Sequence, residues 1–239
     1  MPQRRLSCSL SIVIPAFNEK KGLAQVVPQL YVELEQYISD YEVIVVDDGS
    51  TDETPSVLDE LIVAFPDLVV KTLPNNMGYG FALMRGIELS TKEFVAYVPA
   101  DGQFSVADMR HCFEVLEGSD LVLGYRGGRS DYTFQRILLS YGYLIFLFLL
   151  FRLRYSDVGW VHIWRTQAIR PLRLEGDRGI FILTEIIIRL KRCGAVISEA
   201  PSYYHPRVSG EPKNTKFIVI MKTIRSAISL YWHTRHDAK

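Results

Sequence analysis

Two adjacent carboxylates, Asp47 and Asp48, directly follow an apolar, β-branched run in the first quarter of the chain. At the end of a buried strand they would lose solvation and repel each other, so the arrangement costs free energy. A helix cap supplied by Ser50 or Asp52 explains the turn that follows, but it does not explain both carboxylates. Carboxylates in this place can accept hydrogen bonds from a base N–H or a ribose hydroxyl. The pair is therefore a candidate nucleotide site.

A second acidic turn, PADGQ, follows another apolar run. Its Asp101 carboxylate and Gln103 side-chain carbonyl offer two oxygen ligands, which hard cations such as Mg²⁺ or Mn²⁺ prefer. Two protein ligands make an incomplete site that the oxygens of a nucleotide diphosphate would complete. A plain Asp-Gly turn is the alternative, because this dipeptide is common in turns.

Three arginines far apart in the sequence, Arg126, Arg136 and Arg207, stand at predicted loops or helix starts. Ser140 follows Arg136 by four residues and shares its helix face. Taken singly, each arginine is an ordinary solvated surface charge. Brought together, their guanidinium groups would hold a phosphate through paired hydrogen bonds.

The elements that must position these residues alternate between strand and helix in the first half of the chain. Apolar runs predict strands over 9–15, 42–46, 68–73, 94–98 and 120–123. Helical patterns predict helices over 20–38, 52–65, 78–89 and 106–116, and Pro28 predicts a break or kink in the first of them. Such units imply an α/β fold with a mostly parallel sheet and helices on both faces. Ligands of such sheets bind beyond the carboxyl ends of the strands.

The second half has a different rhythm, with longer helices. The patterns predict helices over 132–154, 181–192 and 216–232 and strands over 160–164 and 195–203. The segment 137–151 is apolar nearly all round and falls short of the roughly 20 residues of a spanning helix. It is either a buried core helix or a helix in the membrane interface, with Arg152 and Arg154 reaching the headgroups. The last helix has the same two interpretations.

Composition narrows the classes of partner. The 27 basic and 27 acidic residues give a formal net charge of zero, which argues against a general nucleic-acid binder. The three cysteines, Cys8, Cys112 and Cys193, are far apart, so they indicate neither a zinc knuckle nor a disulfide framework. A reducing cytoplasm is the expected compartment.

Four motifs occur in order within the first 105 residues: SIVIPAFNE, VIVVDDGSTDET, NNMGYGFALMRGI and FVAYVPADGQF. In these motifs the chain resembles the family 2 glycosyltransferases, and within them the polyprenyl-phosphate glycosyltransferases of the dolichyl-phosphate mannose synthase type. The resemblance implies a GT-A (Rossmann-like) fold, a GDP- or UDP-linked sugar donor, and Mg²⁺ or Mn²⁺. It also implies a single domain, 1–239, with a nucleotide-sugar half (1–125) and an acceptor-binding, membrane-facing part (126–239).

The same resemblance implies roles for particular residues. Donor binding falls to Pro15, Ala16, Asn18, Glu19, Asp47, Asp48, Gly78 and Asp101, and metal binding to Asp101 and Gln103. The patterns Gly-x-Arg, Arg-x-x-x-Ser and Arg-x-x-Gly-x-x-Lys assign the acceptor phosphate to Arg126, Arg136, Ser140, Arg207 and Lys213. Asp101, Arg126 and Arg207 would be catalytic. The remaining candidates are Arg129, Asp157 and Glu185.

Two departures from the family pattern stand out. Pro99 takes the place of the first acidic residue in the usual Asp-x-Asp turn, and the residues after Asp157 differ from the usual Asp-x-x-x-Gly-Phe. Pro99 motivates the alternative of a non-catalytic homologue. His162 lies on an alternating strand and is interpreted as structural rather than as a base.

The expected reaction transfers a hexose of mannose or glucose type to a dolichyl or undecaprenyl monophosphate with inversion. The acceptor phosphate is already an oxyanion near neutral pH, so no strong base is needed. A family member with a hydroxyl acceptor is the alternative, and it would need Asp157 or Glu185 as general base. The expected location is peripheral, on the cytoplasmic face of a membrane. A membrane-anchoring partner and a homo-oligomer both stay open.

Overall fold

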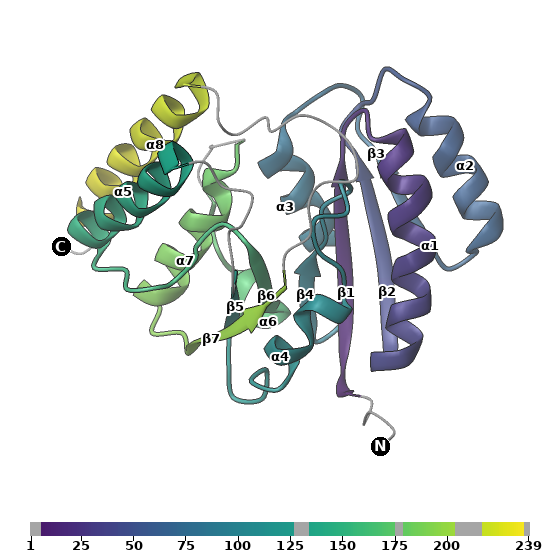
Figure 1. Cartoon of the computed structure of the whole chain (residues 1–239), viewed down its shortest axis with the longest axis horizontal. Coiled ribbons are helices and arrows are strands. Elements are labelled where there is room, and N and C mark those ends of the chain that lie inside the picture. The colour runs from purple at the N-terminus through teal and green to yellow at the C-terminus, as the bar shows by residue number, and fades with distance from the viewer. Residues whose placement is uncertain (1–5, 127–133, 175–178, 204–216, 237–239) are drawn as a thin grey trace.

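A computed structural model describes residues 6–126, 134–174, 179–203 and 217–236, in which helices pack around a seven-stranded sheet (Figure 1). The strands lie in the order β3-β2-β1-β4-β6-β5-β7. In chain order they are β1 (Leu6–Ala16), β2 (Ile38–Asp47), β3 (Val69–Thr72), β4 (Phe94–Tyr97), β5 (Leu121–Arg126), β6 (Val161–Arg165) and β7 (Ile197–Ser202). The helices are α1 (Lys20–Tyr37), α2 (Thr54–Ala64), α3 (Tyr79–Leu89), the 3₁₀ turn η1 (Ala107–Met109), α4 (Arg110–Phe113), α5 (Phe134–Phe151), α6 (Thr166–Ile169), α7 (Phe181–Arg192) and α8 (Phe217–His236).

The sheet is mostly parallel, which confirms the predicted fold class. β1 pairs in parallel with β2 and β4, β2 with β3, and β5 with β7. β6 runs antiparallel to both of its neighbours, β4 and β5. The amino end of β6 therefore comes to the same edge of the sheet as the carboxyl ends of the other strands.

Helices cover both faces of the sheet, because successive side chains of a strand point to opposite sides. In β2, Val43 and Val45 pack in the cluster that contains the apolar side of α1. Ile44 and Val46 pack in a second cluster with Ala82 of α3. α1 and α3 therefore lie on opposite faces, and the loops that lead into both helices meet at the carboxyl edge.

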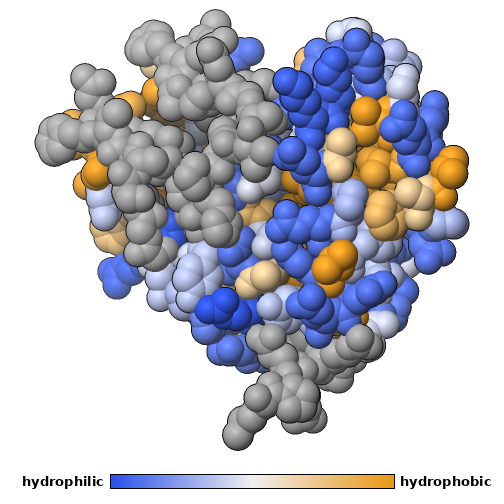
Figure 2. All heavy atoms as spheres, turned by 45° about the vertical axis from the view of Figure 1, so that its right-hand side comes forward, coloured by the Kyte–Doolittle hydropathy of each residue, from blue (hydrophilic) through white to orange (hydrophobic). Residues whose placement is uncertain are grey.

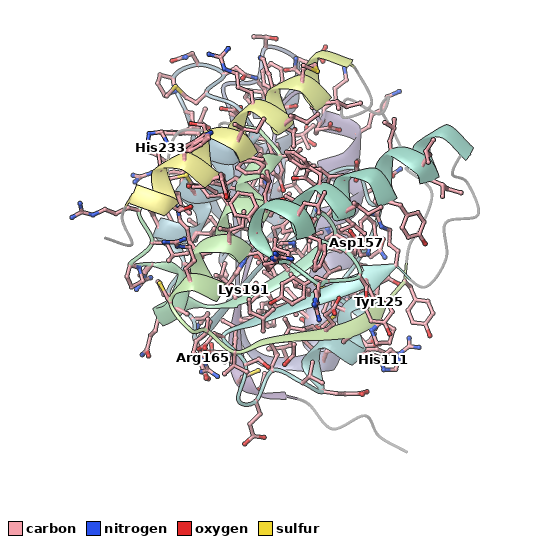
Figure 3. The ribbon with its side chains drawn as sticks, turned by 90° about the vertical axis from the view of Figure 1, so that its left-hand side faces the viewer. His111, Tyr125, Asp157, Arg165, Lys191 and His233 are labelled. Atoms are coloured by element: carbon pink, nitrogen blue, oxygen red, sulfur yellow. The ribbon has the colours of Figure 1, made fainter. Side chains whose placement is uncertain are left out.

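At the other end of the molecule, α5 and α8 form an outer layer (Figures 1 and 3). α7 is buried along almost its whole length, and Thr184 Oγ1 lies 3.0 Å from Tyr143 Oη of α5. α5 buries Leu147 but exposes Leu138, Leu139, Tyr141, Ile145 and Leu149. In α8, Ala227 and Leu230 are buried while Met221, Ile228 and Trp232 are exposed. The interpretation of the segment 137–151 as a buried core helix is therefore wrong.

The exposed apolar side of α5 and α8 differs from the face of the molecule in Figure 2, where hydrophilic residues predominate among those described. Apolar side chains also gather in one area of that face. The described part of the chain contains no helix with the length and hydropathy needed to cross a bilayer.

The helix expected over 106–116 is not a single helix, since it begins as η1 and continues as the short α4. Asp108 accepts hydrogen bonds from the backbone N–H and the hydroxyl of Ser105, which fixes a tight first turn. After α4, Leu116 N–H donates to the Phe113 carbonyl, so the backbone continues in tighter three-residue turns.

Two other helices differ from expectation. α1 continues through Pro28, so the predicted break there is wrong. α5 ends at Phe151 rather than at residue 154, because Arg152 has a φ of 55° in the left-handed region. Its N–H donates to the Phe148 carbonyl and closes the last turn.

β6 carries a buried histidine, His162, as the alternating pattern predicted. Its Nε2 lies 3.2 Å from the Val158 carbonyl oxygen, and its Nδ1 has no hydrogen-bond partner among the described residues. Burial lowers the pKa of His162 to about 4, although the Val158 carbonyl and Asp157 act in the opposite direction. The ring is neutral at pH 7 and donates to the carbonyl, so His162 is not a base for the acceptor.

This histidine predicts a loss of stability in weak acid. Between about pH 6.5 and about pH 4 the unfolded chain binds a proton at His162 that the folded chain does not. As the pH is lowered through this window, the free energy of unfolding should fall by up to about 3 kcal/mol. Urea unfolding across this pH range measures the fall. His162→Phe should flatten the profile, and an unchanged slope in that variant would contradict the prediction.

Candidate functional site

The loops that follow β1 and β2 are joined by hydrogen bonds. Asn18 donates its backbone N–H to Ser50 Oγ over 2.9 Å, and its Oδ1 accepts the Thr51 N–H over 2.8 Å. Glu19 donates its backbone N–H to Thr54 Oγ1 over 3.0 Å. Asn18 has a φ of 54°, in a region that asparagine tolerates better than most residues. The structure thus brings two predicted donor residues, Asn18 and Glu19, against the loop that carries the carboxylate pair.

Asp48 ties the end of β2 to the loop before α3. Its N–H donates to the carbonyl of Ala16, which is buried together with Pro15 at the end of β1. Its two carboxylate oxygens accept the backbone N–H groups of Met77 and Gly78 over 2.7 and 2.8 Å. Gly78 has φ 98° and ψ 155°, a conformation that is open to glycine. Asp48 therefore shapes the wall of the site, and both of its oxygens already have partners.

Asp47 is placed differently. Its Oδ1 accepts the Ser50 N–H over 3.0 Å, whereas its Oδ2 is buried and has no hydrogen-bond partner among the described residues. A buried polar atom without a partner costs free energy. At the end of β2, the unused hydrogen-bonding capacity of the carboxylate pair therefore lies on Asp47, not on Asp48.

The turn after β4 lies against the first turn of α1. A Cβ atom on Gly22 would lie 2.0 Å from the Ala100 carbonyl oxygen, so only glycine allows this approach. Within the turn, Gln103 N–H donates to Asp101 Oδ1 over 3.2 Å. The described part of the chain contains no group of three or more His, Cys, Asp or Glu residues that could hold a metal ion. Oxygens of Asp101 and Gln103 suit a hard cation as two ligands of an incomplete set.

An aromatic cluster connects this turn with β6. Tyr97, at the end of β4, donates its hydroxyl to the Trp160 carbonyl. The Tyr97 ring contacts Tyr79 and Phe104 edge-on, with centroids 6.4 and 5.6 Å apart. Burial raises the pKa of Tyr97 well above its usual value, and the neighbouring Tyr79 raises it further. The phenol thus stays protonated as a donor that holds the loop before β6.

Arg126 and Asp157 form a buried ion pair at the same edge. Arg126 Nε donates to Asp157 Oδ2 over 2.7 Å, and Nη2 donates to Oδ1 over 3.1 Å. The two side chains are 11% and 6% exposed. The Arg126 guanidinium also lies over the Trp160 ring, 4.8 Å from its centroid. Asp157 and Trp160 therefore fix the orientation of Arg126 at the carboxyl end of β5, where Asp157 lies below α5 in Figure 3.

The other predicted acceptor residues are only partly described. Ser140 lies in α5 and is partly exposed. Arg136 belongs to the first turn of α5, but its side chain lies outside the described ones. Arg129, Arg207 and Lys213 also lie outside the described residues. Of the residues predicted to bind the acceptor phosphate, Arg126 and Ser140 are thus the two whose side chains the structure describes.

Glu185, the last predicted candidate, is buried in α7 and 1% exposed. Its Oε1 accepts a hydrogen bond from Arg189 Nε over 2.8 Å, one helical turn later. A buried carboxylate needs a partner, and Arg189 is a partner of Glu185. The ion pair neutralises the carboxylate inside the protein.

Sequence reasoning missed the contributions of Tyr97 and Trp160. Both are aromatic residues next to acidic loops, and an apolar strand pattern hides the hydroxyl that Tyr97 uses. The usable signal was position, because Tyr97 immediately precedes the turn of Asp101, and Trp160 closely follows Asp157.

Comparison with known proteins adds to this geometry. Residues 11–172 match the Glycosyl transferase family 2 domain. The dodecaprenyl-phosphate galacturonate synthase of Rhizobium johnstonii is 29% identical over 181 residues, which are 74% of this chain and 53% of that protein. The undecaprenyl-phosphate 4-deoxy-4-formamido-L-arabinose transferase of Pseudomonas fluorescens is 33% identical over 129 residues, 53% of this chain and 38% of that protein. The matches thus span about half or less of these relatives.

A solved structure has the same fold over nearly the whole chain. It is glucosyl-3-phosphoglycerate synthase from Mycobacterium tuberculosis in complex with Mn²⁺, UDP and phosphoglyceric acid. The TM-score is 0.72 at 18% sequence identity, and the alignment covers 94% of this chain and 79% of that one. At this identity the likeness establishes the fold, which is GT-A as the motifs predicted.

Proposed function

Because the chain belongs to glycosyl transferase family 2, we propose that it transfers a hexose from a nucleoside diphosphate sugar to a polyprenyl monophosphate. Two relatives are named as enzymes of dodecaprenyl and undecaprenyl phosphate. The donor would be GDP- or UDP-linked and the sugar of mannose or glucose type. The carboxyl edge of the sheet would hold the donor, and the segments from Arg126 onward would hold the acceptor.

The observation that carries this proposal is the state of the two candidate bases. A hydroxyl acceptor needs a carboxylate able to remove its proton. Both carboxylate oxygens of Asp157 accept hydrogen bonds from Arg126, and Glu185 is buried and accepts one from Arg189. A phosphate acceptor needs no such base, because it is largely a dianion near neutral pH. The arrangement therefore favours a phosphate acceptor over a hydroxyl acceptor.

The chain's own residues suit a direct displacement with inversion. Asp47 Oδ2 would accept a base N–H or a ribose hydroxyl, while Asp48 keeps the wall of the pocket in place. Asp101 and Gln103 would hold Mg²⁺ or Mn²⁺, which neutralises charge on the departing diphosphate when bound. Arg126 would orient the acceptor phosphate toward the anomeric carbon, together with Arg136, Ser140, Arg207 and Lys213. A product of retained configuration would contradict this mechanism.

The exposed apolar side chains of α5 and α8 support a peripheral position at a membrane surface. They would lie in the interface, beside the helix that carries Arg136 and Ser140. This position would bring the phosphate site to the headgroup level, where a polyprenyl phosphate presents its charge.

The test is a transfer assay with the purified full chain. The protein would receive a panel of radiolabelled GDP- and UDP-sugars, Mg²⁺ or Mn²⁺, and a short polyprenyl monophosphate. Label should enter the lipid phase and be lost on chelation. Transfer to a polyprenol or a sugar hydroxyl, with none to the phosphate, would instead establish the hydroxyl alternative.

Pro99→Asp provides a second prediction, because it restores the usual acidic residue of the metal turn. An added carboxylate would be a third oxygen ligand and should lower the metal concentration needed for half-maximal transfer by about tenfold. A metal titration of the transfer rate measures this. Pro99→Ala is the control that removes the proline without adding a ligand. Equal titration curves for the two variants would contradict the prediction.

A further inference from the structure

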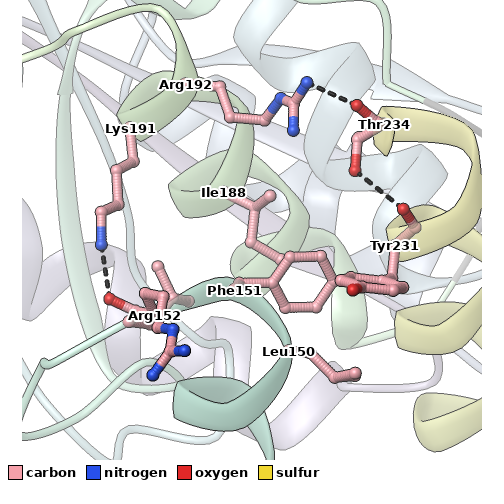
Figure 4. Close-up of a pocket in the computed structure, with 9 residues that line it drawn as sticks. Leu150, Phe151, Arg152, Ile188, Lys191, Arg192, Tyr231 and Thr234 are labelled. Atoms are coloured by element: carbon pink, nitrogen blue, oxygen red, sulfur yellow. Dashed lines mark hydrogen bonds between the residues drawn. The ribbon is translucent and has the colours of Figure 1, made fainter. Parts of the chain in front are cut away.

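A cavity of about 370 Å³ opens between the ends of α5, α7 and α8. Figure 4 shows residues that line it, which belong to these three helices or directly follow α5. Its apolar part is formed by Leu150, Phe151, Leu153, Ile188 and Tyr231. Its polar part is formed by Arg152, Lys191, Arg192 and Thr234, and no acidic residue lines it. The cavity therefore combines a hydrophobic wall with three cationic groups.

Part of this positive charge has a structural role. α5 and α7 end here, and their last carbonyl groups carry negative partial charge. Lys191 Nζ donates to the Arg152 carbonyl over 2.6 Å, and Arg192 Nη2 donates to the Thr234 carbonyl over 2.5 Å. Each contact uses one N–H of a group that has three or five. Capping therefore accounts for the position of these two side chains but not for their full donor capacity.

The three cations have no carboxylate partner among the described residues, whose ion pairs lie elsewhere. The Arg152 guanidinium lies over the Phe148 ring, 5.6 Å from its centroid. All three residues are exposed, so an anion from solution can reach them, and the apolar wall accommodates a hydrocarbon chain. A ligand that satisfies both parts is an anionic amphiphile.

The cavity lies at the end of α5, next to the exposed apolar side of that helix. Ile145 and Leu149 are exposed on that side, six and two residues before the helix ends at Phe151. Leu150 and Phe151 then continue into the cavity wall. A membrane that covers this side of α5 therefore brings its headgroups to the level of Arg152, Lys191 and Arg192.

We propose that this cavity binds the phosphate headgroup of an anionic phospholipid, with the upper part of an acyl chain against Leu150 and Phe151. The proposal rests on the membrane association proposed above and adds to it a site whose residues differ from those proposed to bind the donor and the acceptor phosphate. It makes association depend on anionic lipid rather than on apolar contact alone.

The test is co-sedimentation of the full chain with vesicles of phosphatidylcholine, with and without phosphatidylglycerol. Lys191→Gln combined with Arg192→Gln should lower the affinity for the anionic vesicles by about thirtyfold, since each cation near an anionic surface contributes about fivefold. Binding to pure phosphatidylcholine should change little. The matched control is Lys71→Gln combined with Arg85→Gln, which removes the same charge from β3 and α3, and it should keep its affinity.

A variant that fills the cavity without changing charge separates a site from diffuse attraction. Leu150→Trp should weaken binding to the anionic vesicles by about tenfold, whereas a diffuse basic surface would not respond to it. Melting temperatures establish that the variants are folded. Equal binding to both vesicle types, an equal loss in the control, or unchanged binding of Leu150→Trp would overturn the proposal.

Two further outcomes are distinguishable. Saturable binding of inorganic phosphate at the same residues, without any preference for anionic vesicles, would assign the cavity to a free anion and overturn the lipid source. No binding to either kind of vesicle, with transfer intact toward a dispersed short-chain acceptor, would count against the membrane surface and leave the proposed reaction standing. Absence of transfer together with intact binding to anionic vesicles would count against the proposed reaction and support the proposed lipid site.

Discussion

Asp101→Asn should abolish most of the transfer activity while the protein stays folded. The substitution keeps the shape of the side chain and removes the charge that would hold the cation in the turn after β4. Charge neutralisation by a metal contributes several kcal/mol to such reactions, so kcat/KM should fall by at least about a hundredfold. Initial rates over a range of donor concentrations that extends below KM, at saturating acceptor, measure the loss.

The matched control for this experiment is Asp40→Asn. Asp40 lies near the beginning of β2, at the opposite edge of the sheet, where its ion pair with Lys92 is exposed. An exposed pair contributes little to stability, so this variant should keep both its activity and its melting temperature. An Asp101→Asn variant with the activity of the control would remove the metal turn from the mechanism.

Asp157→Ala should cost both stability and acceptor binding. It would remove the bidentate partner of the Arg126 guanidinium, whose side chain is 11% exposed in the intact pair. Breaking a buried ion pair from one side costs about 3–5 kcal/mol, and urea unfolding would measure that loss. The released Arg126 would also no longer be oriented, so the KM for polyprenyl phosphate should rise more than the KM for the donor.

A double variant separates these two effects. Arg126→Met combined with Asp157→Leu removes both charged groups of the pair and fills the space with apolar atoms, so most of the stability should return. Acceptor binding should stay weak, because the guanidinium is absent. Recovery of acceptor binding in the double variant would show that the pair is structural and does not position the acceptor.

The sequence predicted the sheet well because β1, β2, β4 and β5 are largely buried on both faces and therefore read as apolar runs. All five strands expected in the first half are present, and the acidic loops after β2 and β4 lie at the carboxyl edge. The helix predicted over 106–116 is instead η1 followed by the short α4, because the hydrogen bonds of Asp108 determine its first turn. Apolar spacing carries no information about such a contact.

The site was only partly predictable for a similar reason. The motif identified Asp47 and Asp48 as a pair, but it did not indicate that the two carboxylates have different roles. That division depends on Met77 and Gly78, which occupy both oxygens of Asp48 and neither of Asp47. The pairing of Arg126 with Asp157 spans 31 residues and depends on the direction of β6, which no local pattern in the sequence determines.

The position of β6 has a consequence for how the chain folds during synthesis. β6 lies between β4 and β5 although it follows both of them in the chain. Until residues 161–165 leave the ribosome, the pairing edge of β4 has no partner, and β5 cannot join the sheet. The nascent protein therefore carries an open, apolar strand edge for the time needed to add about 65 residues after β4, and it depends on that interval being short or shielded to avoid aggregation.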